Sequence, residues 1–117
     1  MRLRIKVCCI SSVEEAMLAI EYGADAIGLV GKMPSGPGPI ADYTIAAIAR
    51  KVHPPISSFL LTSEQTANGI INHVKRTNTS TVQIVDELLD GSYDEIRMAV
   101  PSLQIVQVIH VTGMRKY

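Results

Sequence analysis

Short apolar runs alternate with amphipathic segments along the whole chain. The runs occupy residues 3–9, 26–30, 56–61, 81–85 and 103–111 and are rich in branched side chains. Between them, apolar residues recur every three or four positions, which is the spacing of a helix with one buried face. The pattern predicts five strands and four helices in strict alternation.

The predicted helices begin and end at residues of suitable chemistry. Ser12 and Glu15 form a capping box, and Gly23 can adopt the left-handed conformation that ends the first helix. The other helices are expected to start near Asp42, Ser63 and Ser92. The faces expected to be buried are Val13, Ala16, Met17 and Ile20; Ile45, Ile48, Ala49 and Val52; Ala67, Ile70, Ile71 and Val74; and Ile96 with Val100.

Alternating strands and helices favour an α/β fold with a parallel sheet and right-handed crossovers. A complete (βα)8 TIM barrel needs about 250 residues, and this chain has 117. We therefore expect one domain over residues 1–117, a partial barrel of about four and a half βα units with its strands in sequential order and open edges at the first and fifth strands. We expect residues 112–117 to be an atypical C-terminal tail. A flavodoxin-like sheet, with strand order 2-1-3-4-5, is an alternative of the same size.

The composition and charge of the chain indicate which kinds of partner it can bind. The chain is 47% hydrophobic and carries 11 acidic and 11 basic side chains, which are scattered. Such a chain can fill one core, but it has no overall field that would attract nucleic acid or an anionic membrane. The N-terminus alternates charged and apolar residues, and no run is long enough to span a bilayer. We expect a cytoplasmic protein with a small, neutral partner.

The two cysteines are adjacent at the end of the first predicted strand. Neighbours in a strand point to opposite faces, so Cys8 and Cys9 are not expected to form a disulfide or to hold a metal together. No further Cys or His cluster completes a zinc pattern. Because βα-barrel enzymes place their chemistry at the C-terminal ends of the strands, a cysteine here is a candidate reagent.

Two segments carry a resemblance to a known family. Residues 6–16 read Lys-Val-Cys-Cys-Ile-Ser-Ser-Val-Glu-Glu-Ala, and residues 22–28 read Tyr-Gly-Ala-Asp-Ala-Ile-Gly. They resemble the opening of phosphoribosylanthranilate isomerase, Lys-Ile-Cys-Gly-Ile-Thr, then Glu-Asp-Ala, then Gly-Ala-Asp-Ala-Leu-Gly-Phe. The similarity extends more loosely through 45–50, 82–84 and 105–109. It identifies the chain with the N-terminal half of that (βα)8 barrel.

The resemblance implies a reaction and a base. The family catalyses the cofactor-free Amadori rearrangement of N-(5-phosphoribosyl)anthranilate to 1-(2-carboxyphenylamino)-1-deoxyribulose 5-phosphate in tryptophan biosynthesis. The implied general base is Cys8, whose thiolate removes the proton on the sugar carbon next to the imine. Lys6, two residues back on the same face of the strand, is expected to supply positive charge that favours the thiolate.

The chain also departs from the family pattern. Cys9 replaces a glycine, the loop 31–39 lacks the arginine that binds the anthranilate carboxylate, and Lys32 is the nearby cation. The fourth strand ends in Gln-Ile-Val-Asp where the family has Gln-Leu-His-Gly, and the sixth-strand aspartic acid and the later phosphate loops have no counterpart. Lys6, Lys32, Asp86 and His110 are candidate substrate-binding residues, and Asp86 and His110, both at strand ends, are also candidates to replace the missing general acid. His53 and His73 are expected to be solvated.

These observations leave three functions open. The first is the family isomerase, with the isolated chain inactive or very weak because its general acid is missing. The second is a truncated, non-catalytic half-barrel that acts as an oligomer or assembly partner, either with itself or with a complementing C-terminal half. The third is another phosphosugar-binding βα enzyme, since Gly23-Ala24-Asp25-Ala26 recurs in several such families.

Overall fold

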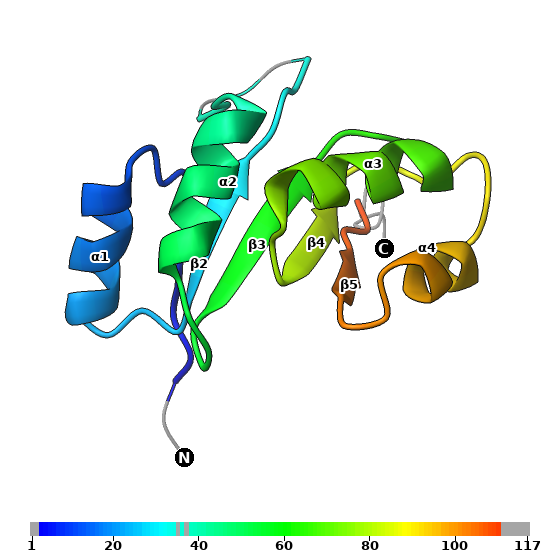
Figure 1. The fold of residues 1–117 in the computed structure, drawn as a ribbon. Helices are drawn as coiled ribbons and strands as arrows, with labels where there is room; N and C mark the ends of the chain where they lie inside the picture. The colour runs from blue at the N-terminus through cyan, green and yellow to red at the C-terminus, as the bar shows by residue number, and fades with distance from the viewer. Residues whose placement is uncertain (1–2, 35, 37, 111–117) are drawn as a thin grey trace, which may run out of the picture.

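The fold is a single parallel sheet with helices along one side (Figure 1). A computed structural model describes residues 3–34, 36 and 38–110. The strands are β1 (Lys6–Val7), β2 (Ala26–Val30), β3 (Ser57–Thr62), β4 (Thr81–Ile84) and β5 (Gln104–Gln107). The helices are α1 (Val13–Glu21), α2 (Asp42–Lys51), α3 (Ala67–Thr77) and α4 (Tyr93–Ala99).

The strands follow one another in sequence order, β1-β2-β3-β4-β5, and every pair is parallel. This order confirms the predicted partial barrel. It also shows that the flavodoxin-like alternative was wrong, because that fold places the second strand at an edge. β1 and β5 are the two edges of the described sheet.

The sheet has two faces of different character. On the helix-covered face, alternate strand residues are completely buried: Ile27, Leu29, Leu60, Val82 and Ile84. On the other face, Lys6 Nζ of β1 donates a hydrogen bond to Gln83 Oε1 of β4 at 2.6 Å, although β2 and β3 lie between them. Four strands in a flat sheet would separate β1 from β4 by about 14 Å. The bond therefore shows that this face is concave, as the interior of a barrel is.

Most of the residues predicted to begin or end a helix do so in the structure. Ser12 Oγ accepts from Glu15 N at 3.1 Å, Ser92 Oγ accepts from Glu95 N at 3.2 Å, and Gly23 has φ +104°. The prediction for α3 was wrong by one turn. Thr66 caps that helix by accepting from Gly69 N at 3.0 Å, while the Ser63 hydroxyl donates to the Lys32 carbonyl.

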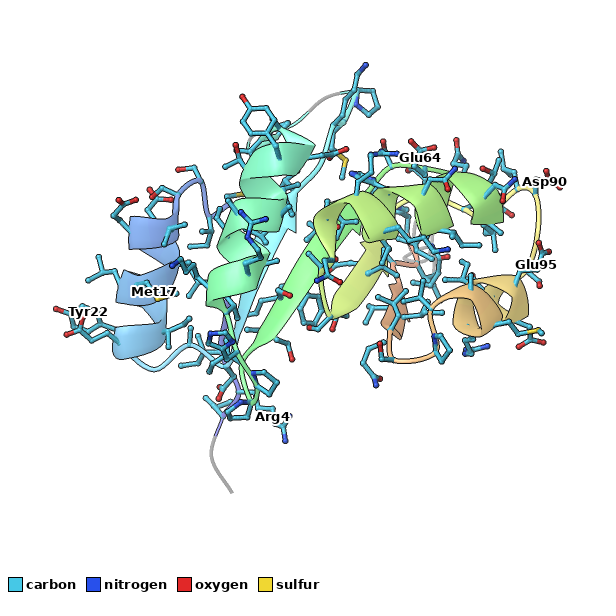
Figure 2. All side chains as sticks on the ribbon, in the orientation of Figure 1. Arg4, Met17, Tyr22, Glu64, Asp90 and Glu95 are labelled. Atoms are coloured by element: carbon cyan, nitrogen blue, oxygen red, sulfur yellow. The ribbon has the colours of Figure 1, made fainter. Side chains whose placement is uncertain are left out.

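The strand bounds and one buried face also differ from prediction. The edge strands are shorter than the apolar runs that contain them, because each has a neighbour on one side only and adds few ladder hydrogen bonds. Residue 111, predicted as the end of the fifth strand, and the predicted tail over residues 112–117 lie outside the described residues. Met17 was expected in the core but is 37% exposed, since α1 is the outermost helix of the row (Figure 2). Within the described residues, no helix has the length and apolarity needed to cross a membrane.

Candidate functional site

Cys8 lies directly after β1, at the C-terminal end of the strand, and is exposed. Val7 pairs in register with Ile27 of the helix-covered face, so Cys8 lies on the concave face. A Cβ atom added to Gly28 would come within 2.7 Å of Cys8 Sγ. The absence of a side chain at Gly28 therefore makes the room that the thiol occupies.

Cys9 turns the chain out of the strand. Its φ is +58°, in the left-handed region that favours glycine, and Ile10 N then donates to Gly28 O at 3.1 Å. Its sulfur lies against the β2–α2 loop, since a Cβ atom on Gly38 would come within 2.9 Å of it. Both cysteines are free thiols. The geometry thus gives Cys9 a different environment from Cys8 and a strained backbone.

The ammonium group of Lys6 is held on the same concave face. Besides its bond to Gln83, Lys6 Nζ lies 4.6 Å from the centroid of the Phe59 ring, a cation–π contact. Its charge is therefore fixed two residues before Cys8, between the first, third and fourth strands. Sequence reasoning paired Lys6 with Cys8 but missed Phe59 and Gln83, because only the curvature of the sheet brings them together.

Asp86 follows β4 and His110 follows β5, so both lie at the same C-terminal end of the parallel sheet as Cys8. His110 Nε2 donates to the carbonyl of Val85, the residue before Asp86, at 2.8 Å. The Asp86 carbonyl in turn accepts from Gln107 Nε2 at 3.0 Å. Because a carbonyl only accepts, Nε2 carries a proton, and Nδ1 of the neutral ring is the unprotonated nitrogen. The structure therefore places Asp86 and His110 after adjacent strands, and their role in substrate binding stays a prediction.

The environment of His73 was predicted wrongly. The sequence suggested a solvated side chain near a helix end, but His73 is 4% exposed. Thr62 Oγ1 lies 2.8 Å from its Nδ1, and Asp42 Oδ1 lies 2.9 Å from its Nε2. Asp42 Oδ2 also accepts from Arg76 Nε at 2.9 Å. The network joins the end of β3, the start of α2 and the middle of α3.

This network resembles a hydroxyl–imidazole–carboxylate relay, but its geometry makes it structural. The Thr62 side chain is fully buried, so no substrate reaches its hydroxyl. Burial by itself would raise the pKa of Asp42, yet the hydrogen bonds and charges of Arg76 and His73 outweigh it and hold that pKa below its ordinary value. The spacing of His73 and Arg76, three residues apart on one helix, is the sequence signal that indicates a shared face.

Lys32 belongs to the β2–α2 loop, just after the C-terminal end of β2. It is exposed and lines a cavity of about 440 Å³ outside the sheet, together with Met33, Pro34, Asp42, Ser63, Glu64, His73 and Arg76. Lys6 and Cys8 share the concave face, and His110 is bonded to the residue before Asp86, whereas none of these four residues lines the cavity beside Lys32. Among the described residues, no three His, Cys, Asp or Glu side chains are grouped so as to hold a metal ion.

The curved sheet, the row of helices and the polar groups at the strand ends define a class of protein, the partial βα barrel. No family model matches the chain. Among curated proteins, N-(5'-phosphoribosyl)anthranilate isomerase 2 of Methanosarcina mazei is 36% identical over 112 residues, covering 95% of this chain and 50% of that protein. The isomerase of Methanocella arvoryzae is 24% identical over 92% of this chain and 51% of its own length.

Solved structures agree on the fold. The phosphoribosyl anthranilate isomerase of Thermococcus kodakaraensis matches with a TM-score of 0.82 at 18% identity, over 95% of this chain and 51% of that chain. The Pyrococcus furiosus isomerase matches with a TM-score of 0.80 at 19% identity, over 99% of this chain and 56% of that chain. The chain is a homologue of N-(5'-phosphoribosyl)anthranilate isomerase, and it spans about half the length of the curated relatives it matches.

Proposed function

We propose that this chain supplies the proton-abstracting half of a phosphoribosylanthranilate isomerase site. The reaction is the Amadori rearrangement of N-(5-phosphoribosyl)anthranilate to 1-(2-carboxyphenylamino)-1-deoxyribulose 5-phosphate. The observation that carries the proposal is the exposed Cys8 thiol at the C-terminal end of β1, in the space opposite Gly28. A phosphoribosyl anthranilate isomerase was crystallised in complex with reduced 1-(o-carboxyphenylamino)-1-deoxyribulose 5-phosphate, and its fold matches this chain with a TM-score of 0.75.

Cys8 is the general base in this proposal. Opening of the ribose ring gives an imine, and the Cys8 thiolate takes the proton from the adjacent sugar carbon. With the imine nitrogen protonated, the electrons of the broken C–H bond form a carbon–carbon double bond and the C=N electron pair moves to nitrogen, which gives the enolamine. This becomes the ketone of the product when the former imine carbon gains a proton and the enol hydroxyl loses its proton. Lys6 contributes positive charge from the concave face, where Gln83 and Phe59 hold it. Lys32, Asp86 and His110 are proposed contacts for the substrate from the surrounding loops and strand ends.

General-acid and general-base groups each contribute about 10² to 10⁴ in rate. The proposed base, Cys8, lies among the described residues, but none of them corresponds to the sixth-strand aspartic acid that the resemblance implies. We therefore expect the purified 117-residue chain to show no turnover or very weak turnover. The test is the isomerase assay on the chain alone and on the chain mixed with the half of the Methanosarcina mazei isomerase 2 that the match leaves uncovered. Turnover should appear only in the mixture, and ready turnover by the chain alone would contradict this account.

A second candidate is a non-catalytic half-barrel that serves as an assembly partner. The two sheet edges at β1 and β5 favour it, because an edge strand presents unpaired backbone groups. A third candidate, another phosphosugar enzyme, shares the strand-end geometry. A binding screen separates them: anthranilate-bearing phosphosugars should bind in preference to other phosphosugars if the isomerase proposal holds. The assembly partner should bind neither class.

A further inference from the structure

Cys8 and Cys9 form a pair of adjacent, free and exposed thiols at the end of β1. The expectation that they point to opposite faces assumed that both belong to the strand. The structure ends β1 at Val7, and Cys9 has a φ of +58°, so the alternation of a strand stops before Cys9. The geometric argument against a bond between the two sulfur atoms therefore does not apply to the folded chain.

Both sulfur atoms lie toward β2, the neighbour of β1 in the sheet (Figure 1). A Cβ atom on Gly28 would come within 2.7 Å of Cys8 Sγ. A Cβ atom on Gly38 would come within 2.9 Å of Cys9 Sγ and 3.5 Å of Val30 Cγ2. Residues 28 and 30 share the concave face of β2, because strand residues two apart point the same way. The two thiols also line one cavity of about 460 Å³, so they face a common space.

A pair of thiols in this arrangement has a defined reaction with a hydroperoxide. The Cys8 thiolate attacks the peroxide, an S–O bond forms, the O–O bond breaks, and the leaving oxygen takes up a proton; Cys8 becomes a sulfenic acid. Cys9 sulfur then attacks Cys8 sulfur, so that the S–S bond forms and the S–O bond breaks. Hydroxide leaves and takes the Cys9 proton as water. The peroxide is reduced, and the chain loses two hydrogen atoms.

Cys9 determines how this oxidation ends. A sulfenic acid without a second thiol nearby goes on to the sulfinic acid, which is irreversible for most proteins. Cys9 stands next to Cys8 at a position where its positive φ would suit glycine better, and a strained residue of this kind is a reason to look for a function. The thiol of Cys9 supplies one, because it captures the Cys8 sulfenic acid before further oxidation.

We propose that Cys8 and Cys9 are a reversible oxidation site, at which a hydroperoxide forms a disulfide between the two adjacent residues. Adjacent Cα atoms are about 3.8 Å apart, below the range of about 4.4 to 6.8 Å in ordinary disulfides, and strain makes a disulfide easier to reduce. A thiol reductant therefore restores both cysteines. The disulfide takes up the Cys8 sulfur, so oxidation switches off the isomerase base; this consequence rests on the proposed function.

Intact-mass spectrometry of the full chain, treated with hydrogen peroxide and kept free of reductant, tests the site. The wild-type mass should fall by two hydrogen atoms, and dithiothreitol should restore it. Cys9→Ser is the matched control, because it keeps Cys8 and removes the second thiol. Its mass should instead rise by one oxygen atom, in a form that dimedone traps, and then by a second. Circular dichroism checks that the variant is folded.

The wild-type chain in urea is a second control. It has the same two thiols, but the turn at Cys9 no longer holds their sulfur atoms on one side of the strand. The disulfide should therefore form about tenfold more slowly in urea than in the folded chain, since fixed orientation speeds a reaction within one molecule.

Three results would overturn the oxidation site. They are a folded wild-type chain that gains oxygen without losing hydrogen, disulfide-linked dimers in place of the bond within one chain, and a bond that forms as fast in urea as in the folded chain. These mass measurements need no turnover, so they are independent of the isomerase proposal. In the isomerase assay on the mixture described above, peroxide should stop turnover and dithiothreitol should restore it. A disulfide that forms while turnover continues would leave the oxidation site standing and would count against Cys8 as the base.

Discussion

Cys8 and Cys9 are neighbours in the sequence, yet their surroundings give them different roles. Cys8 continues the strand and lies over Gly28 on the concave face. Cys9 has the positive φ that the chain needs in order to leave the strand, at the place where the family has glycine. The resemblance identified the position of that glycine, but only the backbone shows that the substitution introduces strain.

Replacing Cys9 with glycine should stabilise the protein. A residue with a Cβ atom in the left-handed region raises the free energy of the folded state by about 1 to 2 kcal/mol, and glycine does not. Glycine also gives the unfolded chain more conformational entropy, which offsets part of this stabilisation. We expect Cys9→Gly to raise the free energy of unfolding by roughly 1 kcal/mol, measured by urea denaturation. Cys9→Ala keeps the Cβ atom and should give no such gain. Equal effects of the two variants would show that the backbone at Cys9 is not strained.

Asp42 should couple stability to pH. The pKa of Asp42 in the folded protein lies below the ordinary 3.8 of the unfolded chain. At a pH between the folded and the unfolded pKa, the unfolded chain therefore binds more protons than the folded chain. The contribution of Asp42 to stability is therefore complete above about pH 4 and is lost as the pH falls through the folded pKa. Asp42→Asn removes that contribution.

Urea denaturation at neutral and acidic pH measures this coupling. The difference in stability between wild type and Asp42→Asn should be largest near neutral pH and should shrink below about pH 4. The control is Asp94→Asn, because the Asp94 side chain is 87% exposed in its pair with Arg97 and an exposed pair contributes little. A difference for Asp42→Asn that stays constant across this pH range would contradict the assigned network.

At the level of helices and strands, the sequence predicted the order and type of every element. The periodicity of apolar residues indicated four helices and five strands, and the capping residues Ser12 and Ser92 are where the pattern put them. The prediction failed at the third helix because three polar residues, Ser63, Glu64 and Thr66, lie close together before it and each suits a helix start. Tertiary contact decides between them, since Ser63 is bonded to the β2–α2 loop.

The two candidate caps of α3 give a direct comparison. Thr66→Ala removes the hydrogen bond from Gly69 N and should lower the free energy of unfolding by about 1 kcal/mol. Ser63→Ala removes only an exposed bond to a loop carbonyl and should cost less. Thermal or urea denaturation of both variants measures the difference. If Ser63→Ala is the more destabilising variant, the position of the cap given by the structure is wrong.

At the scale of the whole molecule, the five sequential strands make half of an isomerase barrel. Strand order followed from the alternation of elements together with the family resemblance, and the structure confirms it. The contacts across the concave face could not be predicted, because Lys6, Phe59 and Gln83 are far apart in the sequence and meet only when the sheet curves. The burial of His73 was missed for the same reason, since its partners come from two other elements.

The central claim is that Cys8 is the base, and isomerase turnover by the completed barrel tests it most directly. The chain carrying Cys8→Ser should be compared with wild type and with Cys9→Ser, each mixed with the complementing half. The account predicts that Cys8→Ser loses about 10² to 10⁴ in turnover, the usual contribution of a general base, while Cys9→Ser keeps most of the activity. Turnover by the Cys8→Ser chain equal to that of wild type would contradict it.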